Sequence, residues 1–240
     1  VIKKRKTKRA RDKNSLITLD VIYKERRERH RIRDVDPDKS KLSSIIDELK
    51  NFEETKGWKT TGAEIELSRN ADRVRSIASI TKLMTAMVTL DYDKDLSRRL
   101  TLTKRVGSFL PRQQYTREQL LEAMLVKSDN GAAETLAEDY PGGRTAFIKE
   151  MNRHAENWDL KHTRFEDASG LGAGNTSTVH DVAVMMTVAA NYWFIRDTST
   201  KKQVAFETRY KKKIRTIRLG HTSGTILFTF DNIVVSKTGL

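Results

Sequence analysis

The sequence predicts an α+β fold with a mostly helical half and a separate group of strands. In 74–90, apolar residues recur largely at three- and four-residue spacing without Gly or Pro, which is the pattern of a buried helix. The stretch 91–191 continues with helical patterns joined by polar connections. After it, β-branched and aromatic residues at 226–230 and 233–235 indicate two strands separated by a polar turn. Helices and strands are therefore expected in different parts of the chain.

The size and composition are those of a globular protein. The chain of 240 residues is long enough for one domain or a small pair with a substantial core. It contains no cysteine, which excludes disulfides and thiolate chemistry. The sequence has no run of about 18 apolar residues, so no membrane-spanning helix is predicted. The basic segment 1–13 is not followed by the apolar stretch that a signal peptide needs.

Positive charge is concentrated in two segments. Of the net charge of +14, residues 1–33 contribute +10 and residues 201–218 contribute +7, so the remainder is slightly acidic. The segment 1–13 has too little apolar material to fold alone and is expected to be a disordered arm. Residues 1–33 are either solvated or attach to an anionic surface or polymer. No specific nucleic acid is expected, because the arm has no aromatic residue for base stacking.

Residues 42–67 contain one helical pattern and two strand patterns. Apolar residues at helical spacing in 42–52 indicate an amphipathic helix. The stretch 58–62 is typical of the end of a strand and a turn, and 63–67 alternates as a half-buried strand does. Residues 1–56 are expected to be a basic arm with a helical segment of unknown function.

Ser79 and Lys82 form the first motif, at the start of the apolar helix. Residues three apart on a helix face the same way, so the Lys82 amine is expected within hydrogen-bond reach of the Ser79 hydroxyl. Serine becomes a good nucleophile only when an adjacent group takes its proton. Lysine can take it if burial or nearby positive charge lowers its pKa. The pair predicts nucleophilic catalysis, although S-x-x-K alone also occurs by chance.

A second motif, Ser128-Asp129-Asn130, is expected in a short loop between two helices. The first helix is expected to be capped at 116–119, and the second is expected over 130–140, where Pro141 stops it. A loop between packed helices can direct side chains into a cleft. The alternative is a plain helix cap, because all three residue types favour caps.

A third motif, Lys237-Thr238-Gly239, ends the last predicted strand, so Lys237 is expected to project beside a cleft. Alone, the motif is only a strand end with a turn glycine. A further apolar helix is predicted at 178–190, and a basic exposed strand or loop at 203–218.

In this order, S-x-x-K, S-D-N and K-T-G are the signature of penicillin-binding serine acyl-transferases and class A β-lactamases. The chain resembles the low-molecular-mass penicillin-binding proteins, which are D-alanyl-D-alanine carboxypeptidases and endopeptidases, and is most similar to the murein DD-endopeptidase branch. The resemblance covers roughly residues 62–240, with further matches at 69–72, 140–143 and 168–171. It implies a β-lactamase/transpeptidase-like fold, in which an antiparallel sheet flanked by helices accompanies an all-helical half, and a penicillin-binding DD-peptidase domain at 57–240.

The resemblance also implies the chemistry. It predicts a serine-type peptidase that cleaves peptidoglycan stem peptides or cross-links through an acyl-enzyme, is inhibited by β-lactams, acts in the periplasm or cell envelope, and needs no cofactor. No metal site is expected, because the five histidines show no paired spacing. The expected roles are nucleophile for Ser79, proton acceptor for Lys82, proton relay to the leaving amine for Ser128, substrate binding for Asn130, Lys237, Thr238 and Gly239, and backbone donation to the oxyanion for Ser79 and Leu240.

The sequence leaves alternatives open. The resembling family continues after the K-T-G strand with two more strands and a helix, whereas this sequence stops at Leu240. A fragment, a partner that supplies those strands, or a degraded relative would each account for this. A serine β-lactamase is the enzymatic alternative, disfavoured because no E-x-x-L-N segment follows Asn130. A structural or wall-binding relative with weak or no activity is the other.

Overall fold

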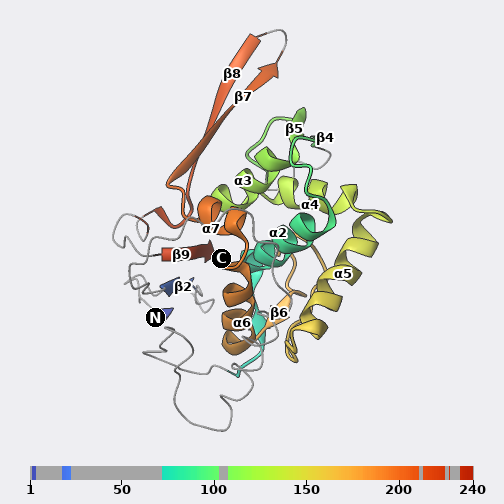
Figure 1. Ribbon diagram of the computed structural model, residues 1–240, viewed down its shortest axis with the longest axis vertical. Helices are drawn as coiled ribbons and strands as arrows, with labels where there is room; N and C mark the ends of the chain where they lie inside the picture. The colour runs from blue at the N-terminus through green and yellow to red at the C-terminus, as the bar shows by residue number, and fades with distance from the viewer. Residues whose placement is uncertain are drawn as a thin grey trace.

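The computed structural model describes residues 2–3, 18–22, 72–102, 108–210, 213–224, 227 and 233–239. A group of helices forms the body, a small sheet lies on one side of it, and a long hairpin projects from it (Figure 1). The helices are η2 Ala78–Ile80 (a 3₁₀ turn), α2 Thr81–Tyr92, α3 Arg117–Lys127, α4 Asn130–Asp139, α5 Gly143–Asn157, α6 Val179–Ala189 and α7 Trp193–Ser199. The strands are β1 Ile2–Lys3, β2 Thr18–Ile22, β3 Arg75–Ser76, β4 Arg99–Thr101, β5 Gln114–Thr116, β6 Thr176–Ser177, β7 Gln203–Tyr210, β8 Lys213–Gly220 and β9 Ile233–Thr238. The predicted α+β fold is confirmed.

Helix α2 is the central element of the core. Every residue from Thr81 to Thr89 is buried, and α3, α4, α5 and α6 all pack against the helix. A helix covered on all sides must be apolar around most of its circumference, and its buried hydroxyls need partners. The Thr85 hydroxyl donates to Ala168 O at 2.6 Å and that of Thr89 donates to Thr85 O at 2.8 Å. The buried helix predicted within 74–90 is confirmed from residue 81 on, whereas 78–80 form the 3₁₀ turn η2 and 75–76 form strand β3.

Helices α3 and α4 form the tight pair that the sequence predicts. Thr116 and Gln119 make a reciprocal capping box at the start of α3, with N···O distances of 3.1 and 3.0 Å. Helix α3 ends at Lys127 and α4 begins at Asn130. The connection is therefore only two residues long, which fixes its position relative to both helices.

Strand β9 pairs antiparallel with β2, and β2 with β1. Thr18 lies opposite Thr238, and Asp20 lies opposite Ser236. The prediction that 1–13 is disordered is thus wrong at residues 2–3, which form β1. Pairing with β2 gives the backbone N–H and C=O groups of β1 hydrogen-bond partners, which an isolated polar segment lacks. The strands predicted at 58–67, the helix predicted at 42–52 and most of the basic stretch 1–33 lie outside the described residues.

The strand predicted at 226–230 is wrong at Leu227, the one described residue of that range. Its N–H donates to Ser223 O at 3.1 Å, a hydrogen bond of the helical type between residues four apart. Leu227 is nevertheless buried. The apolar side chain of Leu227 therefore contributes to the core without belonging to a strand. The second predicted strand is confirmed as β9.

Strands β7 and β8 form an antiparallel hairpin of eight residues each, which projects beyond the helices (Figure 1). Buried Val204, Phe206 and Leu219 anchor its base. The Phe206 ring meets Tyr115 edge-to-face at a centroid distance of 5.9 Å. The strand predicted within 203–218 is confirmed.

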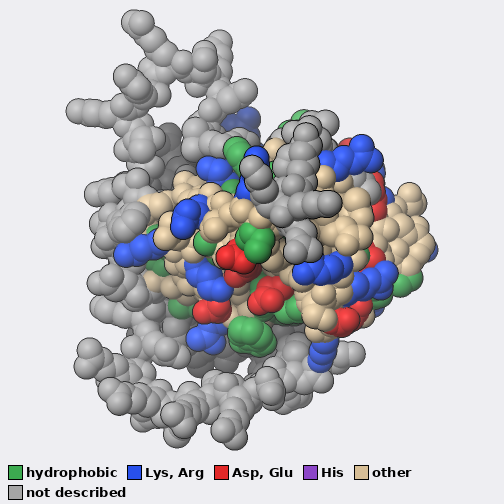
Figure 2. All heavy atoms as spheres, turned by 90° about the horizontal axis from the view of Figure 1, so that it is seen from above, with side chains coloured by type: hydrophobic (Ala, Val, Ile, Leu, Met, Phe, Trp, Pro, Cys, Tyr) green, Lys and Arg blue, Asp and Glu red, His purple; other side chains and the backbone are tan. Residues whose placement is uncertain are grey.

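Basic and acidic side chains are interspersed over the face shown in Figure 2, where the acidic ones gather near its centre. This fits the sequence, in which residues 1–33 and 201–218 together carry +17 of charge and the rest of the chain is slightly acidic. Among the described residues, no helix combines the length and apolar character needed to cross a membrane.

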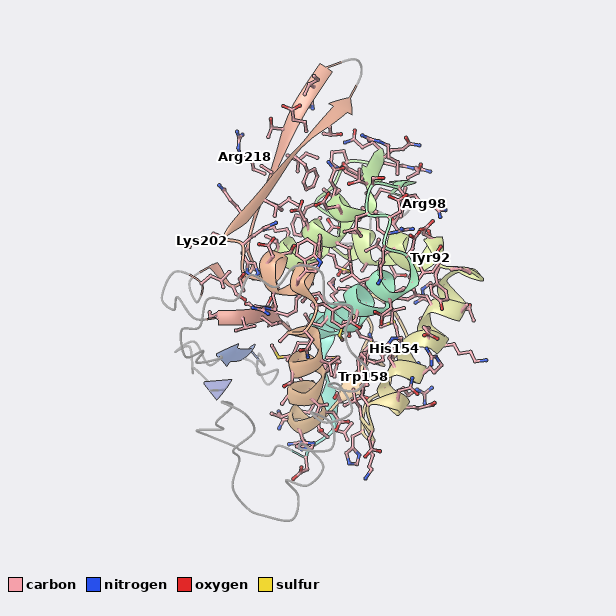
Figure 3. The ribbon with its side chains drawn as sticks, in the orientation of Figure 1. Tyr92, Arg98, His154, Trp158, Lys202 and Arg218 are labelled. Carbon is pink, nitrogen blue, oxygen red and sulfur yellow. The ribbon has the colours of Figure 1, made fainter. Side chains whose placement is uncertain are left out.

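A buried arginine holds the C-terminal end of α2 against α3 and α4. The Arg117 guanidinium, which is fully buried, lies 2.7 Å from Asp93 Oδ2 and 2.6 Å from Asp139 Oδ2 and donates to Asp95 O at 2.7 Å. Its Cζ is 5.6 Å from the centre of the Tyr92 ring. Arg98, which is labelled with Tyr92 in Figure 3, lies 2.9 Å from the other carboxylate oxygen of Asp139, Oδ1.

We expect Arg117→Met to lower the free energy of unfolding by about 3–5 kcal/mol, because it removes the buried guanidinium from the Asp93 and Asp139 carboxylates and leaves Asp139, whose side chain is only 10% exposed, with the half-exposed Arg98. Urea titration monitored by circular dichroism measures this. Arg98→Met is the matched control: its contact to Asp139 is 2.9 Å, but its side chain is 49% exposed, so a loss of at most about 1 kcal/mol is expected. Equal losses in the two variants would contradict the assignment.

Candidate active site

Ser79 and Lys82 meet at the N-terminal end of the core helix. Ser79 lies in the 3₁₀ turn η2, and Lys82 is in the first turn of α2. The Lys82 amine donates to Ser79 Oγ at 2.9 Å and also to the carbonyl oxygen of Ser169. The side chain of Lys82 is fully buried, whereas Ser79 is half-buried. The sequence-predicted pairing of hydroxyl and amine is present.

Burial changes the protonation of this lysine. It lowers the pKa of Lys82 from 10.5 to about 8, while the carboxylates of Asp167, Asp129 and Glu134 oppose part of the shift. A substantial fraction of the amine is therefore neutral near pH 8. This is the condition under which a lysine can accept the proton of a serine hydroxyl.

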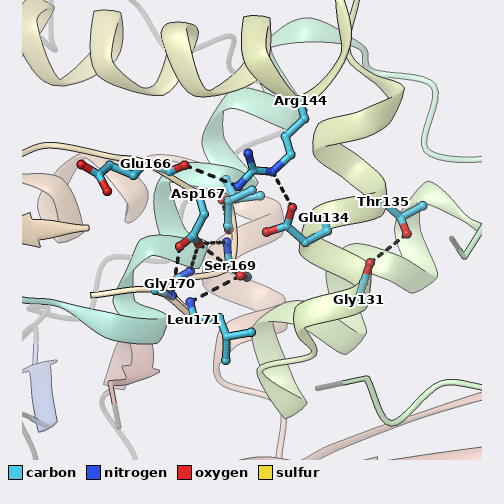
Figure 4. A network of polar contacts seen from close by, with 12 residues as sticks. Gly131, Glu134, Thr135, Arg144, Glu166, Asp167, Ser169, Gly170 and Leu171 are labelled. Carbon is cyan, nitrogen blue, oxygen red and sulfur yellow. Dashed lines mark hydrogen bonds and ion pairs between the residues drawn. The ribbon is translucent and has the colours of Figure 1, made fainter. Parts of the chain in front are cut away.

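A loop that the sequence analysis left without a role holds Lys82 in place. Asp167 accepts hydrogen bonds from the N–H groups of Ser169 at 2.8 Å, Gly170 at 2.5 Å and Gly172 at 3.1 Å (Figure 4). Burial alone would raise the pKa of Asp167, but these donors outweigh it and hold the pKa below its ordinary value. The ionised carboxylate thus fixes the turn whose Ser169 carbonyl accepts from Lys82. The matched stretch 168–171 was the sequence signal for it.

The same loop packs directly on the turn before Ser79. Ala78 has a positive φ of 46°, which L-residues rarely adopt. A Cβ on Gly170 would lie 1.9 Å from the Ala78 carbonyl oxygen, so only glycine fits there. The backbone that presents Ser79 is therefore shaped by a contact between segments about 90 residues apart in sequence.

The second motif caps both helices of its pair. Ser128 is the C-cap of α3 in the left-handed conformation, with φ 61°. Asp129 is the fully buried N-cap of α4: it accepts from Ala132 N at 2.8 Å and from Phe109 N at 2.6 Å. The capping alternative is thus true of Asp129. The loop prediction is right for Ser128, whereas Asn130 is the first residue of α4, as the helix predicted over 130–140 requires.

The third motif reaches the second. The amine of Lys237, on β9, donates to Ser128 Oγ at 2.9 Å and to Thr238 O at 3.1 Å. Lys237 is fully buried. Burial, and then the charge of Lys82, hold the pKa of Lys237 well below its usual value. Strand β9, which carries Lys237, contacts η2, the turn that carries Ser79, so the two serine–lysine pairs lie on neighbouring elements.

The remaining predicted site residues have distinct surroundings. The Thr238 hydroxyl donates to Thr222 Oγ1 at 2.9 Å, and Thr222 is a residue that the sequence analysis did not single out. A Cβ on Gly239 would lie 2.9 Å from Ile77 O, so this glycine lets β9 approach the turn that carries Ser79. Leu240, the expected second oxyanion donor, lies outside the described residues. Within the described part of the chain, no three His, Cys, Asp or Glu side chains gather as metal ligands would.

Comparison with known proteins identifies this constellation. A family model described as D-alanyl-D-alanine carboxypeptidase matches residues 59–240. The D-alanyl-D-alanine endopeptidase of Pseudomonas aeruginosa is 37% identical over 182 residues, which cover 72% of this chain and 57% of the relative. The endopeptidase of Escherichia coli is 34% identical over 180 residues, with the same two shares. The chain thus spans a little over half the length of these curated relatives.

Solved structures show the same fold. The crystal structure of Streptomyces K15 DD-transpeptidase aligns with a TM-score of 0.68 at 30% identity, covering 75% of this chain and 76% of that one. The ampicillin-bound penicillin-binding protein D2 of Listeria monocytogenes aligns with a TM-score of 0.62 at 28% identity, covering 72% of each chain. The β-lactamase/transpeptidase-like fold expected from the motifs is confirmed.

Proposed function

The chain belongs to the D-alanyl-D-alanine carboxypeptidase family, and on that premise we propose that its site is a serine acyl-transferase that cleaves D-alanyl-D-alanine-type peptide bonds. The observation that best supports this is the pair of serine–lysine contacts, Ser79 with Lys82 and Ser128 with Lys237, each 2.9 Å long. Both lysines are fully buried, and burial lowers the pKa of Lys82 to about 8, so that its amine can exist in the neutral form that accepts a proton.

The proposed acylation step uses the first pair. Ser79 Oγ bonds to the substrate carbonyl carbon while its proton passes to the Lys82 amine. The negative charge that develops on the carbonyl oxygen needs backbone N–H donors, for which the Ser79 N–H and the N–H of Leu240 are proposed. Collapse of this intermediate breaks the C–N bond and leaves the acyl group on Ser79.

The second pair is proposed to serve the leaving group. The Ser128 hydroxyl can donate its proton to the departing amine and take back the proton that Lys82 accepted from Ser79, because a hydroxyl both donates and accepts. Lys237 donates a hydrogen bond to Ser128 Oγ and so fixes the position of this hydroxyl. Thr238 offers a hydroxyl to the substrate carboxylate, Asn130 a hydrogen bond to the substrate amide, and Gly239 allows β9 to lie close to the Ser79 turn. Water then hydrolyses the acyl-enzyme.

We propose peptidoglycan as the substrate and the periplasm or cell envelope as the place of action. The supporting observation is the naming of relatives: the Pseudomonas and Escherichia proteins, at 37% and 34% identity, are endopeptidases, whereas the Streptomyces K15 relative, at 30%, is a carboxypeptidase. This favours hydrolysis of cross-links over removal of a terminal D-alanine. Purified cross-linked and monomeric muropeptides, analysed by chromatography after incubation, distinguish the two.

Benzylpenicillin tests the proposal. We expect one penicillin molecule to be added covalently per chain in intact-mass analysis, and trypsin, which cleaves after Arg75 and Lys82, to release the adduct on the peptide 76–82. Fragmentation should place it on Ser79 rather than on Ser76 or Thr81, and unfolded protein should acquire none. Fast penicillin turnover without a lasting adduct would indicate a β-lactamase. No adduct on a folded chain would contradict acyl transfer and favour the structural alternative.

A further inference from the structure

Thr222 is hydrogen-bonded to two of the three motif regions. It follows strand β8, and its N–H donates to Val126 O at 3.0 Å in the last turn of α3, two residues before Ser128. Its Oγ1 accepts from the Thr238 hydroxyl at 2.9 Å. The residue thus links the helix end that presents Ser128 to the strand that presents Lys237.

The turn around Thr222 is held at several points. The preceding residue, His221, donates its N–H to Lys202 O at 2.9 Å, and its ring Nδ1 accepts from Ser223 N at 2.8 Å. Burial, and next the charge of Lys237, lower the pKa of His221 to about 4, so the ring is neutral at physiological pH. The position of the Thr222 side chain is therefore fixed by this turn. The neutral His221 ring adds no positive charge that would itself attract an anion.

Counting hydrogen bonds shows what Thr222 has to offer. A hydroxyl has one proton to donate and two lone pairs to accept with. Thr238 gives its proton to Thr222, whereas the structure, over its described residues, gives the Thr222 proton no acceptor. Thr222 is exposed and Thr238 is half-buried. The Thr222 and Thr238 hydroxyls can therefore both donate to an incoming anion, and only the hydrogen bond between the two hydroxyls is lost.

We propose that Thr222 and Thr238 together bind the terminal carboxylate of the substrate, one hydroxyl to each oxygen. This inference rests on the proposed function, in which Thr238 meets that carboxylate, and it adds Thr222 as a residue that selects substrates ending in a free carboxylate. The exchange is favourable because two hydrogen bonds to an ion replace one between neutral hydroxyls. A neutral chain end, such as an amide, gains less from the second hydroxyl.

Binding to acylation-deficient protein tests this directly. In a Ser79→Ala background, titration calorimetry compares an acyl-D-alanyl-D-alanine peptide with the same peptide carrying a C-terminal amide. Thr222→Val, which keeps the shape but removes the hydroxyl, should weaken binding of the free-carboxylate peptide about 10-fold and of the amide at most about 2-fold. Thr222→Ser should restore the discrimination between the two peptides. A role that is merely structural would weaken both peptides equally.

Parallel acylation of the Ser79-containing chain by benzylpenicillin separates this inference from the proposed function. Acylation without Thr222-dependent discrimination overturns the inference alone. Discrimination without acylation keeps the carboxylate site and refutes acyl transfer. Undetectable binding of the free-carboxylate peptide together with no acylation overturns both. Circular dichroism of Thr222→Val confirms that the comparison is made between folded chains.

Discussion

Ser79→Ala is expected to abolish covalent labelling by benzylpenicillin, with a fall in the second-order acylation rate of at least about 10⁴-fold, the order of loss seen when a serine nucleophile is removed. The oxygen that must bond to the carbonyl carbon is then absent. The fold should survive, because Ser79 is half-buried and loses only its 2.9 Å contact with Lys82. Quenched-reaction mass spectrometry measures the rate.

Ser76→Ala is the matched control for this prediction. Ser76 is an exposed serine on β3, three residues before Ser79, and has no part in the site. Its loss should change the acylation rate at most about 2-fold. Persistent labelling of Ser79→Ala, or an equal loss in Ser76→Ala, would show that another residue accepts the acyl group.

How much of this site could be predicted depends on how local each contact is. The Ser79–Lys82 contact follows from helical geometry, because the two residues are three apart. The Lys237–Ser128 contact joins residues 109 apart, so spacing says nothing about it and only the ordered motifs indicated it. The Thr116 capping box and the buried helix α2 were likewise local patterns, and both were predicted correctly.

The contacts that sequence reasoning missed depend on tertiary structure. Asp167 acts through backbone N–H groups, which every non-proline residue has, so its partners leave no mark in the residue types. Thr222 acquires its place from hydrogen bonds to Val126 and Thr238, which only the folded chain brings near. Leu227 lies in a stretch whose β-branched and aromatic residues are typical of a strand, but its N–H forms a helical hydrogen bond to Ser223 O. In each case a long-range or backbone contact decided the outcome.

Lys82→Met is expected to lower the acylation rate by about 10³-fold, because it removes the group proposed to take the Ser79 proton. The wild-type rate should also depend on pH. Below a pKa of about 8 the Lys82 amine is charged and cannot accept a proton, and above it the amine is neutral. Acylation should therefore rise as pH increases through about 8 and then level off, whereas the residual rate of Lys82→Met should lack this rise.

Stability measurements distinguish loss of the base from loss of the fold. Keeping a buried lysine whose pKa is about 8 rather than 10.5 costs roughly 3 kcal/mol at pH 7, because the unfolded chain holds the proton more tightly. This cost falls as pH rises from 8 to 10.5. Methionine removes the cost but leaves the Ser169 carbonyl without its donor, which offsets part of the gain. Lys82→Met should thus unfold at pH 7 with a free energy no more than about 1 kcal/mol below wild type. A large destabilisation would mean that Lys82 is needed for folding, and its effect on acylation would then say nothing about proton transfer.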